Sequence, residues 1–280
     1  MTGMTGITEN MSGEKPDTIK ILQSRLSDLA AGCKLFYKHD VPSTNDWAFQ
    51  LGSERNIAPA VFLCDIQTQG KGRMGRVWES REGASLTFTV LIEPKCPPES
   101  FPVLTLVYGL AACTAIRKLG GFDAMIKWPN DVVFKGRKLC GILSGIIPER
   151  KQVFTGSGFN LRKTKLPPEL ENKAISMEEC GKFPDPNDML TAVFEEYKKR
   201  LEVFESTGNM AGLKDEYEAL LINKDRYSAV SIRENGRETK LEGRAVGIDI
   251  NGGLIFKTLD GRVINISSGE VSVSGIYGCE

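Results

Sequence analysis

Three hairpin signals follow one another closely in the last part of the chain. Asn235-Gly236, Asn251-Gly252 and Asp260-Gly261 separate short runs in which apolar and polar residues alternate. Asn-Gly and Asp-Gly pairs favour the tight turns that join antiparallel strands, because these residues tolerate positive φ. Five strands within about fifty residues predict a small antiparallel barrel. The change in pattern predicts a domain boundary near residue 225.

The chain before that boundary mixes helical and strand periodicities, which predicts an α+β fold with a mixed sheet packed against helices. Helices are expected over residues 17–31, 102–119, 186–207 and 210–221. Strands are expected over residues 34–39, 60–66, 85–92, 122–128, 131–134, 139–147 and 152–156, the one at 85–92 half-buried because its apolar residues alternate. The predicted division is a flexible tail over 1–20, a first domain over 21–225 and the barrel over 226–280.

Turn and cap residues sharpen several of these boundaries. Ser43 or Thr44 is expected to cap a short helix that follows. Asp185 is expected to cap a longer helix whose first position is Pro186. The segment Lys135-Gly136-Arg137 predicts a tight hairpin turn between two strands.

Composition narrows the class of protein. Thirty-six basic residues balance thirty-six acidic ones, which argues against bulk electrostatic binding to nucleic acid or to a membrane. Seven cysteines without a C-x-x-C pair predict free thiols in a reducing compartment. His39 is the only histidine, so zinc sites and histidine-based triads have little to be built from. Without an apolar leader in residues 1–20, and with residues 101–119 expected as a buried helix, we expect a cytoplasmic protein.

The segment over residues 67–78, QTQGKGRMGRVW, combines glycines with cations. The residues concerned are Gly70, Lys71, Gly72, Arg73, Gly75 and Arg76. Glycines let the backbone approach a ligand closely, and amides and cations can converge on a phosphate or carboxylate. The segment is not a Walker A loop, because no G-K-[ST] ends it. A merely flexible basic loop is the alternative.

Three further segments carry polar groups at expected strand ends. Residues 127–131, KWPND, join a cation, an amide and a carboxylate, with structural pairing of Asp131 and Lys127 as the alternative. Residues 137–143, RKLCGIL, begin a strand with Lys138, which could also be simply exposed. Residues 156–161, GSGFNL, lack the third glycine of a dinucleotide-binding fingerprint.

Taken together and in this order, these segments resemble the motifs of biotin protein ligases. The matching family patterns are G-R-G-R-x-G-R-x-W at 70–78, K-W-P-N-D at 127–131, K-L-x-G-I-L at 138–143, a G-x-G-x-N turn at 156–160 and S-T-N at 43–45. Residues 247–254 and 268–271 resemble the family's C-terminal Src-homology-3-like barrel. The resemblance covers about residues 35–275. It implies a biotin/lipoate-ligase-like catalytic domain followed by that barrel.

The family resemblance implies a two-step reaction. Biotin and ATP form biotinyl-5′-AMP with release of pyrophosphate, and biotin then passes to a lysine of a biotin carboxyl carrier protein or domain with release of AMP. ATP with Mg²⁺ and biotin are therefore the expected small molecules. Nucleic acid and membrane are not expected partners, and a homodimer is an expectation by resemblance only.

The resemblance also assigns roles to residues. The expected catalytic residues are Arg73, Lys138, Asp131 and Lys127. The expected biotin-binding residues are Ser43, Thr44, Asn45, Gln67, Gly70, Lys71, Gly72, Arg73, Lys138, Gly141 and Gly156. The residues expected to bind ATP or the adenylate are Lys71, Arg73, Arg76, Trp78, Asn130, Lys138 and Asn160. Mg²⁺ is expected with ATP near Asn130 and Asp131, without a side-chain cluster of its own, and a core role is the alternative for Trp78.

Two departures from the family pattern stand out. Lys71 occupies a position where arginine is usual, which keeps the charge but loses the bidentate fork. The stretch before residue 35 is too short for the helix-turn-helix domain of the bifunctional members, so we expect the monofunctional type. The alternatives are a lipoate or octanoate ligase, a non-catalytic biotin or nucleotide sensor, and a DNA-bound regulator.

Overall fold

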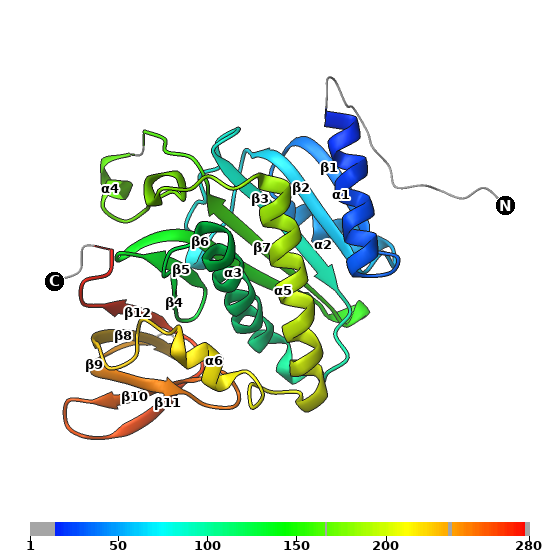
Figure 1. Ribbon diagram of the computed structural model, residues 1–280. Helices are drawn as coiled ribbons and strands as arrows, with labels where there is room; N and C mark the ends of the chain where they lie inside the picture. The colour runs from blue at the N-terminus through cyan, green and yellow to red at the C-terminus, as the bar shows by residue number, and fades with distance from the viewer. Residues whose placement is uncertain (1–14, 166, 235–236, 278–280) are drawn as a thin grey trace.

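The computed structural model describes residues 15–165, 167–234 and 237–277. A seven-stranded sheet carries helices on both faces, and a five-stranded sheet lies at one end of it (Figure 1). The larger sheet has the order β1-β2-β3-β7-β6-β5-β4, with β1 and β2 parallel and the other neighbours antiparallel. Its strands are β1 Lys34–Val41, β2 Ala60–Gln67, β3 Ser85–Ile92, β4 Met125–Lys127, β5 Asp131–Phe134, β6 Arg137–Ile147 and β7 Gln152–Asn160. The predicted mixed sheet is confirmed.

Alternate residues of β1 and β2 pack on opposite faces of this sheet. Leu35 and Val61 belong to the main hydrophobic cluster, whereas Phe36 and Phe62 belong to a second, smaller one. The helices on the main side are α1 Lys15–Leu29, α3 Leu104–Gly120 and α5 Pro186–Thr207, and on the other side α2 Thr44–Glu54. Because both faces are covered, β3 is buried almost throughout; the prediction of a half-buried strand there was wrong.

The expected caps and turns are present. The Ser43 side chain accepts a hydrogen bond from the Asp46 amide and caps α2. Asp185 caps α5 by accepting from the amides of residues 187 and 188. Lys135 and Gly136 both have positive φ, 49° and 74°, as a type I′ turn between β5 and β6 requires.

Several element boundaries differ from the prediction, among them the strand expected over 122–128, which is only β4 Met125–Lys127. The helix expected over 210–221 is only α6 Lys214–Ala219, and the start of α3 is preceded by the 3₁₀ segment Pro98–Val103. The strand expected over 152–156 continues to Asn160, so the predicted G-x-G-x-N turn is strand and not turn. The remaining short elements are 3₁₀ turns at Arg73–Gly75, Pro148–Arg150 and Glu178–Cys180 and helix α4 Pro168–Glu171.

The apolar helix α3 belongs to the core. The helical stretch Pro98–Gly120 is long and apolar enough to cross a membrane by composition, yet 72% of its most apolar window is buried inside the fold. Its buried side chains face α5 and the sheet as part of the main hydrophobic cluster. The prediction of a buried helix is confirmed.

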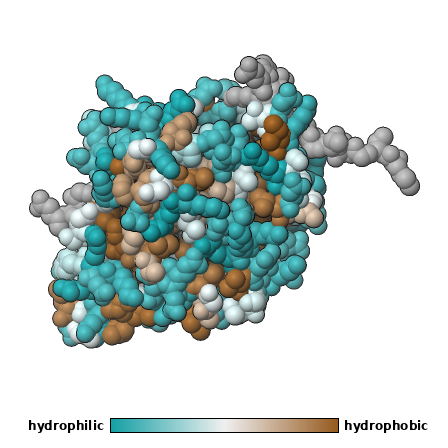
Figure 2. All heavy atoms as spheres, in the orientation of Figure 1, coloured by the Kyte–Doolittle hydropathy of each residue, from teal (hydrophilic) through white to brown (hydrophobic). Residues whose placement is uncertain are grey.

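The C-terminal sheet has the order β11-β10-β9-β8-β12 and is antiparallel throughout. Its strands are β8 Tyr227–Glu234, β9 Arg237–Ile248, β10 Leu254–Thr258, β11 Val263–Ile266 and β12 Glu270–Val273. Asn251-Gly252 and Asp260-Gly261 lie in its turns as expected, whereas Asn235-Gly236 lies outside the described residues. Hydrophobic residues gather on the visible surface of this sheet (Figure 2), and Leu259 and Val263 are among its exposed apolar residues.

Trp128 joins the two sheets. Its side chain is 1% exposed and its indole Nε1 donates to the Gly252 carbonyl oxygen at 3.0 Å. Its backbone amide donates to Asn223 Oδ1 at 2.8 Å. One continuous hydrophobic cluster contains residues of both sheets, so the C-terminal sheet packs against the larger one.

Replacing Trp128 by phenylalanine is expected to lower the free energy of unfolding by about 2–4 kcal/mol, because a cavity forms and the Gly252 carbonyl loses its donor. Urea unfolding followed by circular dichroism measures this change. Trp47→Phe is the matched control: Trp47 is only partly buried, in the smaller cluster, and a smaller loss is expected. Equal losses in the two variants would contradict the bridging role of Trp128.

Candidate functional site

Two adjoining cavities lie between the large sheet, the 67–78 segment and the end of the C-terminal sheet. The narrow inner cavity has a volume of about 50 Å³ and the wide outer one about 490 Å³. Residues that line both are Gly72, Arg73, Trp78, Asn130 and Lys138. The predicted site residues are therefore brought together, and two cations stand at the junction of the cavities.

The inner cavity has a polar wall built on the start of α2 and the end of β2. Of the residues predicted to bind biotin, those that line this cavity are Ser43, Thr44, Asn45, Gln67, Lys71, Gly72, Arg73, Lys138, Gly141 and Gly156. Gln67 Oε1 accepts from the Thr44 amide at 2.7 Å and from the Thr44 hydroxyl at 3.0 Å. Asn45 Nδ2 donates to the Leu143 carbonyl at 3.0 Å. These bonds fix the side-chain amides, so their remaining groups are preorganised to meet a polar ligand.

The floor of the inner cavity is bare strand backbone. A Cβ atom on Gly156 would lie 2.1 Å from Asn45 Oδ1, and one on Gly158 would lie 2.2 Å from the Trp78 ring. Glycine is required at both positions because a side chain rests directly on the strand. These glycines, expected to form a turn, serve instead as flat strand surface.

The glycine-rich segment forms a small hairpin of its own. The Gly72 amide donates to the Arg76 carbonyl at 2.7 Å, and the Trp78 amide donates to the Gly70 carbonyl at 2.9 Å. Met74, at its tip, has a φ of 57°. Gly70 supports this hairpin, because a Cβ there would lie 2.3 Å from the Trp78 carbonyl oxygen. It is not among the residues that line the two cavities, and its contact with a ligand stays a prediction.

The three cations of this hairpin have different partners. Arg73 Nη1 donates to Asn130 Oδ1 at 3.1 Å, and its Nη2 donates to the Gly269 carbonyl at 3.4 Å. Arg76 forms an ion pair with Glu270. Lys71 pairs with Asp46 at 2.7 Å at the mouth of the inner cavity. The segment is thus tied to the large sheet, to α2 and to the C-terminal sheet.

A shift in strand register brings Lys138 to Asp131. Asp131 faces Gly141 across β5 and β6, but the register shifts between Val132 and Val133, so Val133 faces Lys138. Side chains alternate between the faces of a sheet, so this extra residue turns Lys138 to the face of Asp131. Lys138 Nζ lies 2.6 Å from Asp131 Oδ1.

Asp131 is buried, at 8% exposed, and surrounded by donors and positive charge. Burial works to raise its pKa, but the charges of Lys138 and Lys127, together with hydrogen bonds from Lys138 and Tyr277, outweigh it. The net pKa of Asp131 is below its ordinary value, so it is a carboxylate at neutral pH. Asp131 therefore forms an ion pair with Lys138, and the charge of Lys127 also acts on it.

The outer cavity is wide, cationic and partly apolar. Its charged and polar lining residues include Arg73, Arg76, Glu79, Lys127, Asn130, Asp131, Lys138, Asn160, Lys173, Glu270, Ser272 and Tyr277. Asn160 Nδ2 donates to the Lys138 carbonyl at 3.1 Å. Excess positive charge beside apolar surface suits an anion attached to a ring system.

Sequence reasoning missed several members of the site. They are Thr89, Lys173, Glu270 and Tyr277. Thr89 donates to Asn45 Oδ1 at 2.7 Å, and Tyr277 donates to Asp131 Oδ2 at 2.7 Å across 146 positions of sequence. Alternation along β3 could have signalled Thr89, but no local pattern links the end of the chain to Asp131.

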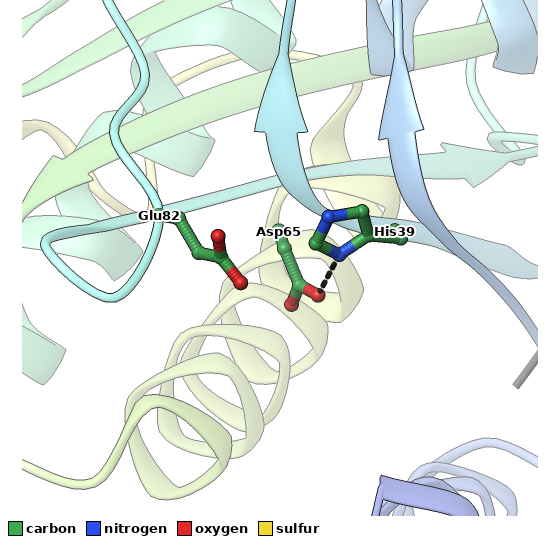
Figure 3. Close-up of side chains that lie close together, drawn as sticks. All are labelled: His39, Asp65 and Glu82. Atoms are coloured by element: carbon green, nitrogen blue, oxygen red, sulfur yellow. Dashed lines mark hydrogen bonds and ion pairs between the residues drawn. The ribbon is translucent and has the colours of Figure 1, made fainter. Parts of the chain in front are cut away.

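A separate group of side chains lies outside both cavities. His39 on β1, Asp65 on β2 and Glu82 before β3 bring their ligand atoms within 4.8 Å of one another (Figure 3). His39 Nδ1 and Asp65 Oδ2 are hydrogen-bonded at 2.9 Å, and the Tyr37 hydroxyl donates to the same oxygen at 2.6 Å. Because these groups already bind one another at the surface, we assign no metal to them.

Comparison with known proteins agrees with this geometry. Residues 37–160 match the biotin/lipoate A/B protein ligase family, and residues 228–274 match the biotin protein ligase C-terminal domain. The biotin–(acetyl-CoA-carboxylase) ligase of Paracoccus denitrificans is 30% identical over 245 residues, which are 83% of this chain and 98% of that protein. The chain belongs to the biotin protein ligase family.

Other members of the biotin protein ligase family are similar over most of the chain. The bifunctional ligase/repressor BirA of Bacillus subtilis is 29% identical over 82% of this chain and 71% of its own length. The Aquifex aeolicus biotin protein ligase, solved in complex with biotin and ATP, has a TM-score of 0.73 and 28% identity, covering 86% of this chain and 98% of that one. The expected fold and the assignment as a biotin protein ligase are confirmed, and the matched C-terminal domain argues against a lipoate ligase.

Replacing Lys138 by methionine is expected to raise the pKa of Asp131, because burial then meets less positive charge. Lys127→Met should raise it less, since the charge of Lys127 contributes less. Carboxyl ¹³C NMR during a pH titration measures both. In the unmodified protein the ionised Asp131 contributes stability above the ordinary aspartate pKa, and this is lost as the pH falls through the lower folded-state value. An unchanged titration in the Lys138→Met protein would contradict the role of the pair.

Proposed function

We propose that this protein activates biotin with ATP to biotinyl-5′-AMP and then transfers biotin to a lysine of a biotin carboxyl carrier protein. The observation that carries the proposal is the position of Arg73 and Lys138, which line both the polar inner cavity and the cationic outer one. Two anions that must react are best brought together where positive charge faces both.

Biotin would occupy the inner cavity. The ureido head would meet Ser43, Thr44, Asn45 and Gln67, whose side chains line the cavity. The acyl chain would run over the glycine floor towards Lys138. An acid without a polar head would leave the buried polar groups of this site without hydrogen-bond partners. This disfavours octanoate as a substrate. The similar Aquifex aeolicus ligase was solved in complex with biotin and ATP, which supports a site that takes both molecules.

ATP would occupy the outer cavity. Arg73 and Lys138 would face its α-phosphate, while Arg76 and Asn160 line the rest of the cavity. The biotin carboxylate attacks the α-phosphorus and pyrophosphate leaves, which gives a mixed anhydride. Trp78 lines both cavities and lies over Gly158, where it would shield the anhydride from water.

In the second step the carrier amine attacks the acyl carbon, the carbon–oxygen bond to phosphate breaks and AMP leaves. The lowered pKa of Asp131 makes it a weak base, because an effective base has a pKa near the working pH. Asp131 would therefore orient the amine by accepting its hydrogen bond, and the proton lost from nitrogen passes to solvent.

Asn130 and Asp131 do not fit a magnesium site held by the protein. Arg73 donates to Asn130 Oδ1, and the Asp131 oxygens meet Lys138 and Tyr277. The positive charges of Arg73 and Lys138 beside these oxygens disfavour a further cation there. Magnesium would instead arrive on the phosphates of ATP, as this ion commonly does, and no step here depends on a protein ligand to it.

The setting we propose is the cytoplasm. The six cysteines that the structure describes are free thiols, and burial raises the pKa of Cys33 to about 12, which makes it inert. Such thiols fit a reducing compartment, where ATP is abundant. A homodimer stays a prediction.

The direct test is ATP–pyrophosphate exchange by the purified protein, with biotin, lipoate or octanoate as the only acid. Exchange that requires biotin is expected. Exchange with lipoate or octanoate at an equal rate would overturn the choice of substrate, and tight biotin binding without exchange would indicate a sensor. Lys138→Ala is the companion variant: we expect it to lose exchange while keeping its circular dichroism spectrum, because the junction then lacks its central charge.

Arg73→Gly is expected to release biotinyl-AMP faster, by about tenfold or more, because the loop loses contacts to Asn130 and Gly269 and a charge that faces phosphate. Gel filtration of preloaded enzyme with labelled intermediate measures retention. Arg81→Gly, which removes an exposed arginine outside both cavities, is the control. Equal retention in all three proteins would contradict a closing role for the loop.

A further inference from the structure

One wall of the outer cavity comes from the end of the C-terminal sheet. The segment over residues 269–277 reaches the large sheet's site at three points. The Gly269 carbonyl accepts from Arg73, Glu270 pairs with Arg76, and the Tyr277 hydroxyl donates to Asp131 Oδ2 at 2.7 Å. The contact of Tyr277 with Asp131 matters most here, because Asp131 is the carboxylate proposed to orient the carrier amine.

Tyr277 is anchored independently of that hydroxyl. Its backbone amide donates to the Gly136 carbonyl at 2.8 Å, in the turn between β5 and β6. Gly136 allows this approach, because a Cβ there would lie 2.4 Å from the Gly275 carbonyl oxygen. The ring lies under Lys127, with Nζ 5.1 Å from the ring centroid. The phenol is therefore delivered to Asp131 by contacts that a phenylalanine would keep.

The phenol acts as a donor in this position. Burial and the neighbouring Asp131 carboxylate raise the pKa of Tyr277 well above its ordinary value. Its proton consequently stays on the oxygen over the whole working range of pH. Asp131 then has one oxygen against Lys138 and the other against Tyr277, which fixes the plane of the carboxylate.

We propose that Tyr277 is a positioning residue for the transfer step, holding Asp131 in the orientation that receives the carrier amine. This rests on the proposed ligase reaction. During activation the charge of Lys138 is shared with the biotin carboxylate and the α-phosphate, so its hold on Asp131 weakens. The Tyr277 hydroxyl, whose hydrogen bond to Asp131 does not involve Lys138, remains on Asp131 throughout. The C-terminal sheet thereby completes the catalytic site of the large one.

The test separates the two steps in Tyr277→Phe. ATP–pyrophosphate exchange with biotin reports activation, and single-turnover transfer from preformed biotinyl-AMP to an apo biotin carboxyl carrier domain reports transfer. We expect exchange to stay within about twofold, and the kcat of transfer to fall about tenfold or more with little change in KM, as for a lost hydrogen bond to a charged group.

Tyr227→Phe is the matched control. Tyr227 lies in the same sheet and donates to the Glu242 carboxylate at the surface, at 2.6 Å. Its loss should leave both steps unchanged. Hydroxylamine serves as a second acceptor of the biotinyl group. It is small and uncharged at neutral pH, so its attack needs no oriented carboxylate. Its reaction with biotinyl-AMP bound to the Tyr277→Phe protein should therefore match that of the unmodified enzyme.

Three outcomes would overturn the inference: transfer at the unmodified rate, an equal fall in exchange and transfer, or an equal fall with the carrier domain and hydroxylamine. Tyr277→Ala adds a check, since damage in that variant with none in Tyr277→Phe would assign the effect to the ring instead of the hydroxyl. Absence of biotin-dependent exchange in the unmodified protein would remove the ligase proposal itself, a result distinct from any failure at Tyr277.

Discussion

Moving a carboxylate out of water costs roughly several kcal/mol of folding free energy, unless nearby charges and hydrogen bonds replace its hydration. Asp131 meets this constraint with Lys138 against one oxygen and Tyr277 against the other. Each partner reaches it only because a larger arrangement holds: the register of β5 and β6 for Lys138, and the packing of the C-terminal sheet for Tyr277. The surroundings of this carboxylate thus depend on both sheets.

The placement of charge also separates the two halves of the reaction in space. Arg73 and Lys138 stand where the cavities join, and Asp131 lies on the side of the outer cavity. In the proposed reaction, cations would face the point where the two anions combine, and the Asp131 carboxylate would lie beside the incoming amine. Trp78 lies on Gly158 at the junction of the two cavities. A single protonation state of Asp131 serves throughout, since its pKa is held below the ordinary value.

Much of this arrangement could be predicted from the sequence, because the signals are local. The Ser43 cap, the turn at Lys135-Gly136 and the strands of the large sheet follow from short-range patterns. Glycines gave the wrong local prediction at 156–160: glycine is common in turns, but here it is needed because Asn45 and Trp78 lie on the strand. Tyr277 could not be found, because its contact depends on how two distant sheets pack. The pairing of Lys138 with Asp131 could not be predicted either, because it depends on a register shift that the residue types do not indicate.

That register shift also limits how the protein can change. A hairpin at the surface ordinarily accepts insertions and deletions, since the turn is exposed and its length is a matter of local geometry. Between β5 and β6 the count of residues decides on which face Lys138 emerges. Gaining or losing one residue there would shift the pairing of the two strands and point the lysine away from Asp131. The length of this hairpin is therefore constrained by chemistry several ångströms away, and sequence drift in it is confined to substitutions.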